Sequence, residues 1–227
     1  MAPAWLTVVA WIYLSVCSCC AAAIAYDIFG NGRRQSMGVM EAVFPVTALY
    51  LGPLALAFYW RWGRAPRGTR EMNGMEKRPY WVMMATEVSH CGAGCTLGDV
   101  ISEFAIFGLA LTINGSMLGA EYLGDYILAL MFGIAFQYFA IAPMRGLGLK
   151  DGLVAAAKAD FISLTFFEIG LFAWMAVMTF VLFPAPHTLM ASSPSFWLLM
   201  QVGMIAGSAT SWPANVWLVR RGIKVPM

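Results

Sequence analysis

Long apolar stretches alternate with short polar ones along the whole chain. A helix needs about 20 mostly apolar residues to cross roughly 30 Å of hydrocarbon. Stretches of that size predict six transmembrane helices, at residues 3–26, 37–60, 80–113, 120–143, 153–183 and 195–219. The polar segment 61–79 is short and rich in Gly, so it is not expected to form a soluble domain. The pattern therefore predicts one all-α domain over residues 1–227, a polytopic membrane helix bundle.

The composition supports this class and excludes several others. Of the 227 residues, 60% are hydrophobic and only 11% are charged, whereas soluble domains carry about 25% charged residues. A net charge of +2 gives no reason to expect a nucleic-acid partner. The chain also has no phosphate-binding loop, no dinucleotide fingerprint and no hydrolase motif. We therefore expect the lipid bilayer as its main partner, no nucleotide, and a transport role rather than an enzymatic one.

The basic residues predict an orientation, because Lys and Arg near helix ends are retained in the cytoplasm. All but two of the 14 basic residues follow the second, fourth or sixth apolar stretch. The exceptions are Arg33 and Arg34, which follow the first stretch. With six spans, this distribution predicts that both termini are cytoplasmic.

Small residues on the last stretch predict close helix packing. Gly203, Gly207 and Ser211 recur every four residues and so share one helix face. Such a face brings helices together either within the chain or in a homo-oligomer, and both readings stay open.

The third stretch is the most unusual, because its 34 residues would extend about 51 Å as one straight helix. We expect a helix that is either long and tilted or broken near Gly92 and Gly94. Polar side chains recur on it at intervals of four and form a slanting stripe that cannot face lipid: Glu87, Cys91, Cys95, Asp99 and Glu103.

The energetic cost of these acidic residues points to a role. Each costs about 2.5–3.5 kcal/mol near the centre of a bilayer on insertion scales. One interpretation is a proton or cation relay through Glu87, Asp99, Glu103 and, on the fifth stretch, Glu168. The alternative is that these carboxyls are merely paired or protonated inside the bundle. We expect Asp160 to pair with Lys158, and Glu121 and Asp125 to lie in solvent at a helix end.

Thiols beside an imidazole predict a soft metal site at His90, Cys91 and Cys95, because thiolates select copper(I) and zinc. On an intact helix His90 would point about 100° away from Cys91, so this site needs the break at the glycines. Secondary thiols are available on the first stretch at Cys17, Cys19 and Cys20, unless they serve as small apolar packing residues. A redox dithiol is the competing interpretation of Cys91 and Cys95, although the spacing is wider than Cys-x-x-Cys.

The segment around these cysteines also carries a resemblance. The sequence Ser-His-Cys-Gly-Ala-Gly-Cys-Thr-Leu-Gly-Asp at 89–99, with Glu103 after it, resembles the signature of a bacterial family of small multi-pass membrane proteins catalogued as a domain of unknown function. The likeness extends from Tyr80 to the last apolar stretch. It implies a location in the bacterial inner membrane and an association with copper or other metal handling.

These observations lead to one functional hypothesis and two alternatives. We expect a membrane permease or channel for a soft metal cation, copper or zinc, with an intramembrane His/Cys site and an acidic relay. The alternatives are a membrane thiol-disulfide oxidoreductase and an accessory subunit of a larger membrane complex.

Overall fold

The computed structural model describes residues 2–68 and 78–224, apart from the side chains of residues 143–145. In this part of the chain the secondary structure is helical, with no β-strand beyond one isolated bridge in a turn. Seven α-helices follow one another: α1 (Ala4–Ala25), α2 (Met40–Leu51), α3 (Pro53–Phe58), α4 (Tyr80–Leu109), α5 (Met117–Arg145), α6 (Leu149–Val177) and α7 (Pro194–Arg220). Short π-helical turns extend α1, α3 and α6 to Gly30, Gly63 and Leu182. The prediction of an all-α bundle is confirmed.

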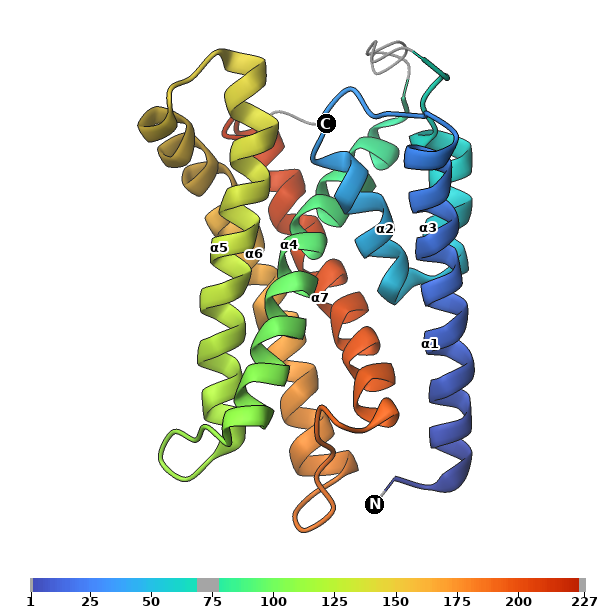
Figure 1. The fold of residues 1–227 in the computed structure, drawn as a ribbon. Helices are drawn as coiled ribbons and strands as arrows, with labels where there is room; N and C mark the ends of the chain where they lie inside the picture. The colour runs from blue at the N-terminus through green and yellow to red at the C-terminus, as the bar shows by residue number, and fades with distance from the viewer. Residues whose placement is uncertain (1, 69–77, 225–227) are drawn as a thin grey trace.

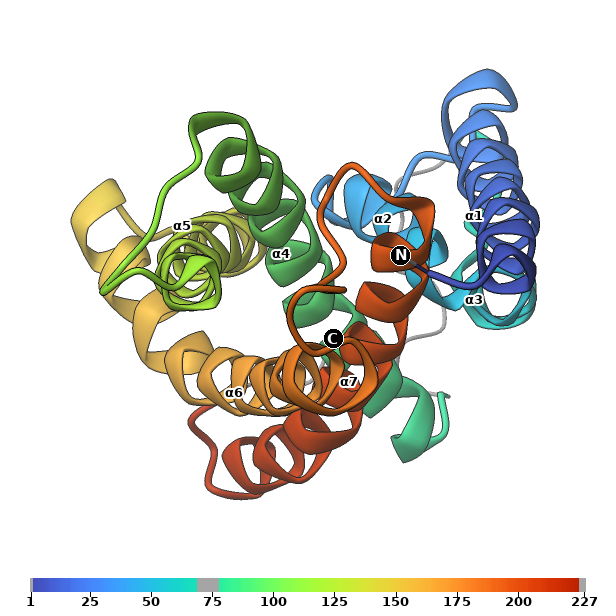
Figure 2. The same ribbon diagram turned by 90° about the horizontal axis from the view of Figure 1, so that it is seen from below.

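Four of the helical segments are long and apolar enough to cross a membrane: Ala4–Gly30, Tyr80–Leu109, Met117–Ala142 and Leu149–Leu182. Large apolar side chains cover their outer surfaces, and Trp5, Leu109 and Phe180 are each about two-thirds exposed. In the views of Figures 1 and 2, α4 lies between α5 on one side and α2 on the other. A surface of this kind is compatible with lipid as the surrounding medium.

The second apolar stretch does not form one crossing helix, so that prediction is wrong. The backbone of Gly52, with φ of +52°, separates α2 from α3. The turn lies near the middle of α1, where the Tyr13 hydroxyl donates to the Tyr50 carbonyl. The chain then returns to the end of α1, where Arg64 pairs with Asp27 at 2.8 Å. Helices α2 and α3 therefore form a hairpin that enters the bundle from one end and leaves at the same end (Figure 1).

Because of this hairpin, the helices that follow it run, relative to α1, in the opposite direction to that predicted for six crossing helices. The Thr7 hydroxyl at the start of α1 lies 3.4 Å from the Ser195 hydroxyl at the start of α7. Helices α1 and α7 therefore run in the same direction, and Arg220 ends α7 at the opposite end of the bundle (Figure 1). The described chain thus begins and ends at opposite ends of the bundle, so the predicted six crossing helices with both termini on one side are not confirmed.

The same topology gathers the basic residues at one end, here called the basic end. Every described Lys and Arg lies at or near it: Arg33, Arg34, Arg61, Arg64, Arg67, Arg78, Arg145, Lys150, Lys158, Arg220, Arg221 and Lys224. Arg70 and Lys77 lie outside the described residues. The loops at the other end, 110–116 and 183–193, contain no Lys, Arg, Asp or Glu. The two arginines that disagreed with a six-helix topology thus agree with this one.

Helix α4 is long rather than broken, because its glycines serve close packing. A Cβ atom on Gly98 would lie 2.5 Å from the backbone nitrogen of Ala129, and one on Gly94 would lie 2.8 Å from Cα of Gly133. Only glycine allows α4 and α5 to approach this closely. The predicted break near Gly92 and Gly94 is therefore wrong, whereas the predicted long helix is confirmed.

The small-residue face of α7 is used inside the chain. A Cβ atom on Gly203 would lie 2.5 Å from Leu171, and one on Gly207 would lie 2.8 Å from Phe167, both on α6. The prediction of close packing within the chain is confirmed for this face. A homo-oligomer stays a prediction and would have to use another surface.

Candidate functional site

The polar stripe of α4 faces the interior of the bundle. Its five members, Glu87, Cys91, Cys95, Asp99 and Glu103, are each at most 1% exposed. From Glu87 to Glu103 the stripe extends about 24 Å, at 1.5 Å per residue. The expectation that it avoids lipid is confirmed. Its residues belong to two groups that differ in charge.

The first group, here called the lysine cage, surrounds the ammonium of Lys224 near the basic end. The Lys224 Nζ atom lies 2.9 Å from Oε2 of Glu87 and 3.0 Å from Oδ1 of Asp160. It also donates to Oδ1 of Asn215 at 3.0 Å and to Sγ of Cys91 at 3.3 Å. All five side chains are buried. Residues from α4, α6 and α7 thus meet at one buried cation.

Asp160 holds this cage together through several hydrogen bonds. Its Oδ1 atom accepts from Sγ of Cys91 at 2.9 Å and from the Ser163 hydroxyl at 2.9 Å. Its ionic partner is Lys224 and not the predicted Lys158, which is exposed. A buried carboxylate with these partners is compensated both by charge and by hydrogen bonding.

The second group, here called the acidic cluster, lies farther along α4, toward the end of the bundle opposite the basic end. It comprises Asp99 and Glu103 on α4, Asp125 on α5 and Glu168 on α6. These carboxyls are at most 1% exposed and lie close enough to interact electrostatically with one another. Asp125 was expected in solvent and is fully buried, because α5 turns it toward α4. The partly exposed Glu121 interacts with Glu103 at the edge of the cluster.

The acidic cluster lacks the compensation that the lysine cage has. Among the described residues, no Lys or Arg forms an ion pair with it, and the side chains that can hydrogen-bond to Asp125 and Glu168 are neutral or acidic: Ser102, Glu103 and Cys95. The thiol of Cys95 interacts with Glu168 and Asp99 and so connects the cluster to the cage along α4. Buried carboxyls without a basic partner are costly in a membrane and typically serve ion or proton movement.

The predicted His/Cys metal site is not assembled. The ring of His90 lies against Phe136, with ring centroids 6.1 Å apart, and neither ring nitrogen has a hydrogen-bond partner within the described part of the chain. Cys91 instead faces Asp160. No group of three or more His, Cys, Asp or Glu in the described chain is arranged to hold a metal ion. The unbroken α4 explains this, since the site needed a break near Gly92.

The thiols of α1 lie apart from those of α4. All five cysteines are free. Cys17 lies against Gly52 at the hairpin turn, Cys20 packs in the apolar core between α1 and α2, and Cys19 is exposed. Cys17 and Cys20 therefore act as packing residues, and the predicted secondary thiols do not join Cys91 and Cys95.

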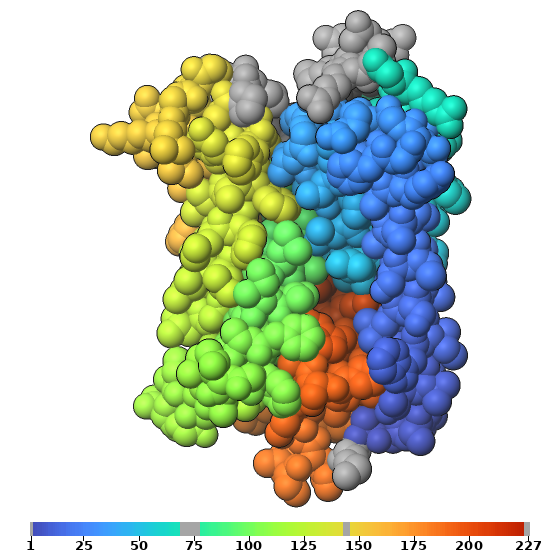
Figure 3. Space-filling model, viewed as in Figure 1, coloured from blue at the N-terminus to red at the C-terminus, as the bar shows by residue number. Residues whose placement is uncertain are grey.

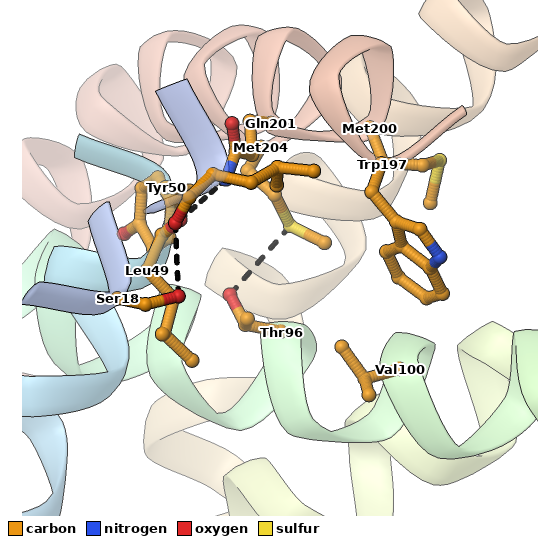
Figure 4. Close-up of a pocket in the computed structure, with 10 residues that line it drawn as sticks. Ser18, Leu49, Tyr50, Thr96, Val100, Trp197, Met200, Gln201 and Met204 are labelled. Atoms are coloured by element: carbon orange, nitrogen blue, oxygen red, sulfur yellow. Dashed lines mark hydrogen bonds between the residues drawn. The ribbon is translucent and has the colours of Figure 1, made fainter. Parts of the chain in front are cut away.

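A cavity below the hairpin is apolar and has few polar groups to offer a ligand (Figure 4). It has a volume of about 190 Å³ and lies between α1, α2, α4 and α7, where the hairpin stops and α7 reaches the surface (Figure 3). The amide of Gln201 donates to the Leu49 carbonyl at 2.6 Å, and the Thr96 hydroxyl donates to Gly92. The Gln201 amide nitrogen and the Thr96 hydroxyl are thus bonded within the protein, whereas Oε1 of Gln201 has no hydrogen-bond partner among the described residues.

Sequence reasoning missed Lys224, Asn215 and Asp125 as parts of the two groups. Asn215 could have been identified from the sequence, because an amide inside an apolar helix needs a hydrogen-bond partner. Lys224 could not, because it follows the last apolar stretch and resembles an ordinary basic residue at a cytoplasmic helix end.

The fold and the two buried groups define an all-helical bundle suited to a membrane, with ionisable residues in its interior. A family model described as "Domain of unknown function (DUF4396)" matches residues 80–224, and the chain belongs to this family. The match begins with α4 and ends at Lys224, so it includes the lysine cage and the acidic cluster and excludes α1–α3. No curated protein and no solved structure matches the chain. The expected membership of an uncharacterised family is confirmed, while the bacterial origin and the His-Cys motif as its signature stay predictions.

Proposed function

We propose that the chain is an integral membrane permease that moves a cation through the space between α4, α5 and α6. The observation that carries the proposal is the acidic cluster, in which Asp99, Asp125 and Glu168 are buried together with no basic partner among the residues that the structure describes. Carboxyls in this setting can take up and release a cation or a proton. Glu87, Asp99, Glu103 and Glu168 are the proposed relay.

The proposed location is the cell membrane, the inner membrane of a bacterium, with the basic end in the cytoplasm. This orientation follows the retention of Lys and Arg on the cytoplasmic side. It places the start of α1 and the loops 110–116 and 183–193 outside. Cations would enter near Glu121 and the acidic cluster and leave near the lysine cage, or move in reverse.

The proposed substrate is a soft metal cation, copper or zinc, exchanged for protons. Cys95 supplies a thiol near the carboxyls of Glu168 and Asp99, and sulfur and oxygen are donor types that zinc accepts, although these three residues are not arranged as a metal site in the described chain. His90 has no part in this set, because it faces α5. The sequence contains no nucleotide motif, so an ion gradient is the proposed driving force.

Transport by reconstituted protein tests this function. Lipid vesicles with the purified protein are expected to take up zinc or copper(I) in a saturable manner and to show a change of internal pH in the opposite direction. Protein-free vesicles provide the baseline. Vesicles that match the baseline for both metals and for protons would contradict the proposal, and a role as thiol oxidoreductase or accessory subunit would then be favoured.

A further inference from the structure

Three buried side chains carry polar atoms that the described chain does not satisfy. They are here called the histidine cluster: His90 on α4, Gln137 on α5 and Asp160 on α6, each at most 1% exposed. Within the described chain, no hydrogen-bond partner is present for either ring nitrogen of His90, for Oε1 of Gln137 or for Oδ2 of Asp160. Buried polar atoms in proteins are nearly always hydrogen-bonded, so these atoms indicate a ligand.

The packing of α4 on α5 places two of these side chains at the same level of the bundle. A Cβ atom on Gly94 would lie 2.8 Å from Cα of Gly133, at the contact of the two antiparallel helices. His90 lies one helical turn before Gly94, and Gln137 lies one turn after Gly133, so both continue that contact toward the basic end. The contact of His90 with Phe136, the neighbour of Gln137, agrees with this register.

Asp160 reaches the same contact from α6. A Cβ atom on Gly133 would lie 3.3 Å from Oδ2 of Asp160, whereas Oδ1 of Asp160 is bonded to Cys91 and Lys224. His90 and Asp160 lie close enough to interact electrostatically. One oxygen of Asp160 therefore belongs to the lysine cage, and the other is directed toward the contact of α4 and α5.

The atoms of the histidine cluster determine which kind of ligand they can bind. Oδ2 of Asp160 and Oε1 of Gln137 only accept hydrogen bonds, whereas a neutral His90 donates with one ring nitrogen and accepts with the other. None of these atoms is bonded to another. The ligand must therefore bridge them, donating at least two hydrogen bonds and accepting one. Water does both, and a buried water typically makes about three hydrogen bonds to otherwise unsatisfied polar groups.

We propose that the histidine cluster is a buried water site, in which water bridges Asp160 to His90 and Gln137. The site lies beside the lysine cage, between the acidic cluster and the basic end. Its role rests on the proposed function: the bridge is a hydrogen-bonded step by which protons pass between Asp160 and the contact of α4 and α5. Gln137 is a positioning residue, because its amide holds the water and carries no proton of its own.

Radiolytic labelling of the full-length protein in detergent tests the water site without any transport. X-ray pulses convert bound water into hydroxyl radicals, which oxidise the side chains next to it. We expect oxidation of His90, which is 0% exposed, and none of Met175, which is equally buried in the apolar core although a thioether is oxidised readily. An unmodified His90 would overturn the proposal. Equal oxidation of both residues would also overturn it, because His90 would then need no water of its own.

Two glutamine variants make the labelling specific. Gln137→Leu keeps the size of the side chain and removes the amide, so the oxidation of His90 is expected to be lost. Gln201→Leu is the matched control, because it removes another buried amide, on α7, and should leave the oxidation of His90 unchanged. Equal oxidation of His90 in Gln137→Leu and the wild type would overturn the proposal. If Gln137→Leu does not fold, the comparison of His90 with Met175 in the wild type decides.

Lipid vesicles with the same variants test the proton role. Gln137→Leu is expected to lose proton movement, while Gln201→Leu moves protons like the wild type. Proton movement at the wild-type rate in Gln137→Leu would overturn this role of the bridge. A wild type that moves neither metal nor protons would instead contradict the proposed function, and the labelling of His90 would still decide on the water site.

Discussion

Asp160→Asn is expected to lower the free energy of unfolding by about 3–5 kcal/mol, the usual cost of breaking a buried ion pair from one side. The substitution leaves the ammonium of Lys224 with one carboxyl instead of two and weakens the acceptor of Cys91 and Ser163. All of these side chains are buried, so water cannot replace the lost charge. Thermal or denaturant unfolding in detergent measures the effect.

Two further variants make this result specific. Asp151→Asn lies in the first turn of the same helix and is exposed, so its effect should stay within about 0.5 kcal/mol. Combining Asp160→Asn with Lys224→Met should recover part of the stability, because the unpaired ammonium is removed as well. If Asp160→Asn costs no more than Asp151→Asn, the cage does not stabilise the bundle.

Labelling of single introduced cysteines is expected to give an all-or-none pattern across the membrane. With the observed helix arrangement and the proposed orientation, Ala2→Cys is expected to react with an impermeant thiol reagent added outside intact cells. Ser36→Cys and Arg221→Cys react only after permeabilisation, because both lie at the basic end. The unmodified chain gives the background from its own cysteines.

Ser36→Cys distinguishes the hairpin from a crossing helix. If residues 37–60 crossed the membrane, as hydropathy alone suggests, Ser36 would lie on the opposite side from Arg221. Ala2 would then lie on the same side as Arg221. Labelling of Ser36→Cys from outside would therefore contradict the hairpin of α2 and α3.

The sequence anticipated the features that depend on local pattern. Polar side chains recur every four residues from Glu87 to Glu103 and therefore share one helix face. This spacing predicted a buried stripe, because placing acidic side chains in lipid costs too much free energy. The length of the third apolar stretch anticipated the long helix α4. Both predictions depend only on helix geometry and on the apolar lipid around the helices, and both are confirmed.

The sequence did not reveal features that depend on tertiary packing. Hydropathy cannot separate an apolar segment that crosses from one that turns back at Gly52, since both are equally apolar. Gly94 and Gly98 were ambiguous, because glycine serves both helix breaks and close helix contacts. The pairing of Lys224 with Asp160 could not be predicted, because only the fold shows that the residues after α7 turn back toward Asp160.

The most direct test of the account is cation uptake by vesicles that contain variants of the acidic cluster. Asp125→Asn and Glu168→Gln remove one charge each and keep the side-chain size, so the bundle should still fold. The account predicts that both variants reduce metal and proton movement to the level of protein-free vesicles, while Asp151→Asn transports like the wild type. Uptake at the wild-type rate in both variants would contradict it.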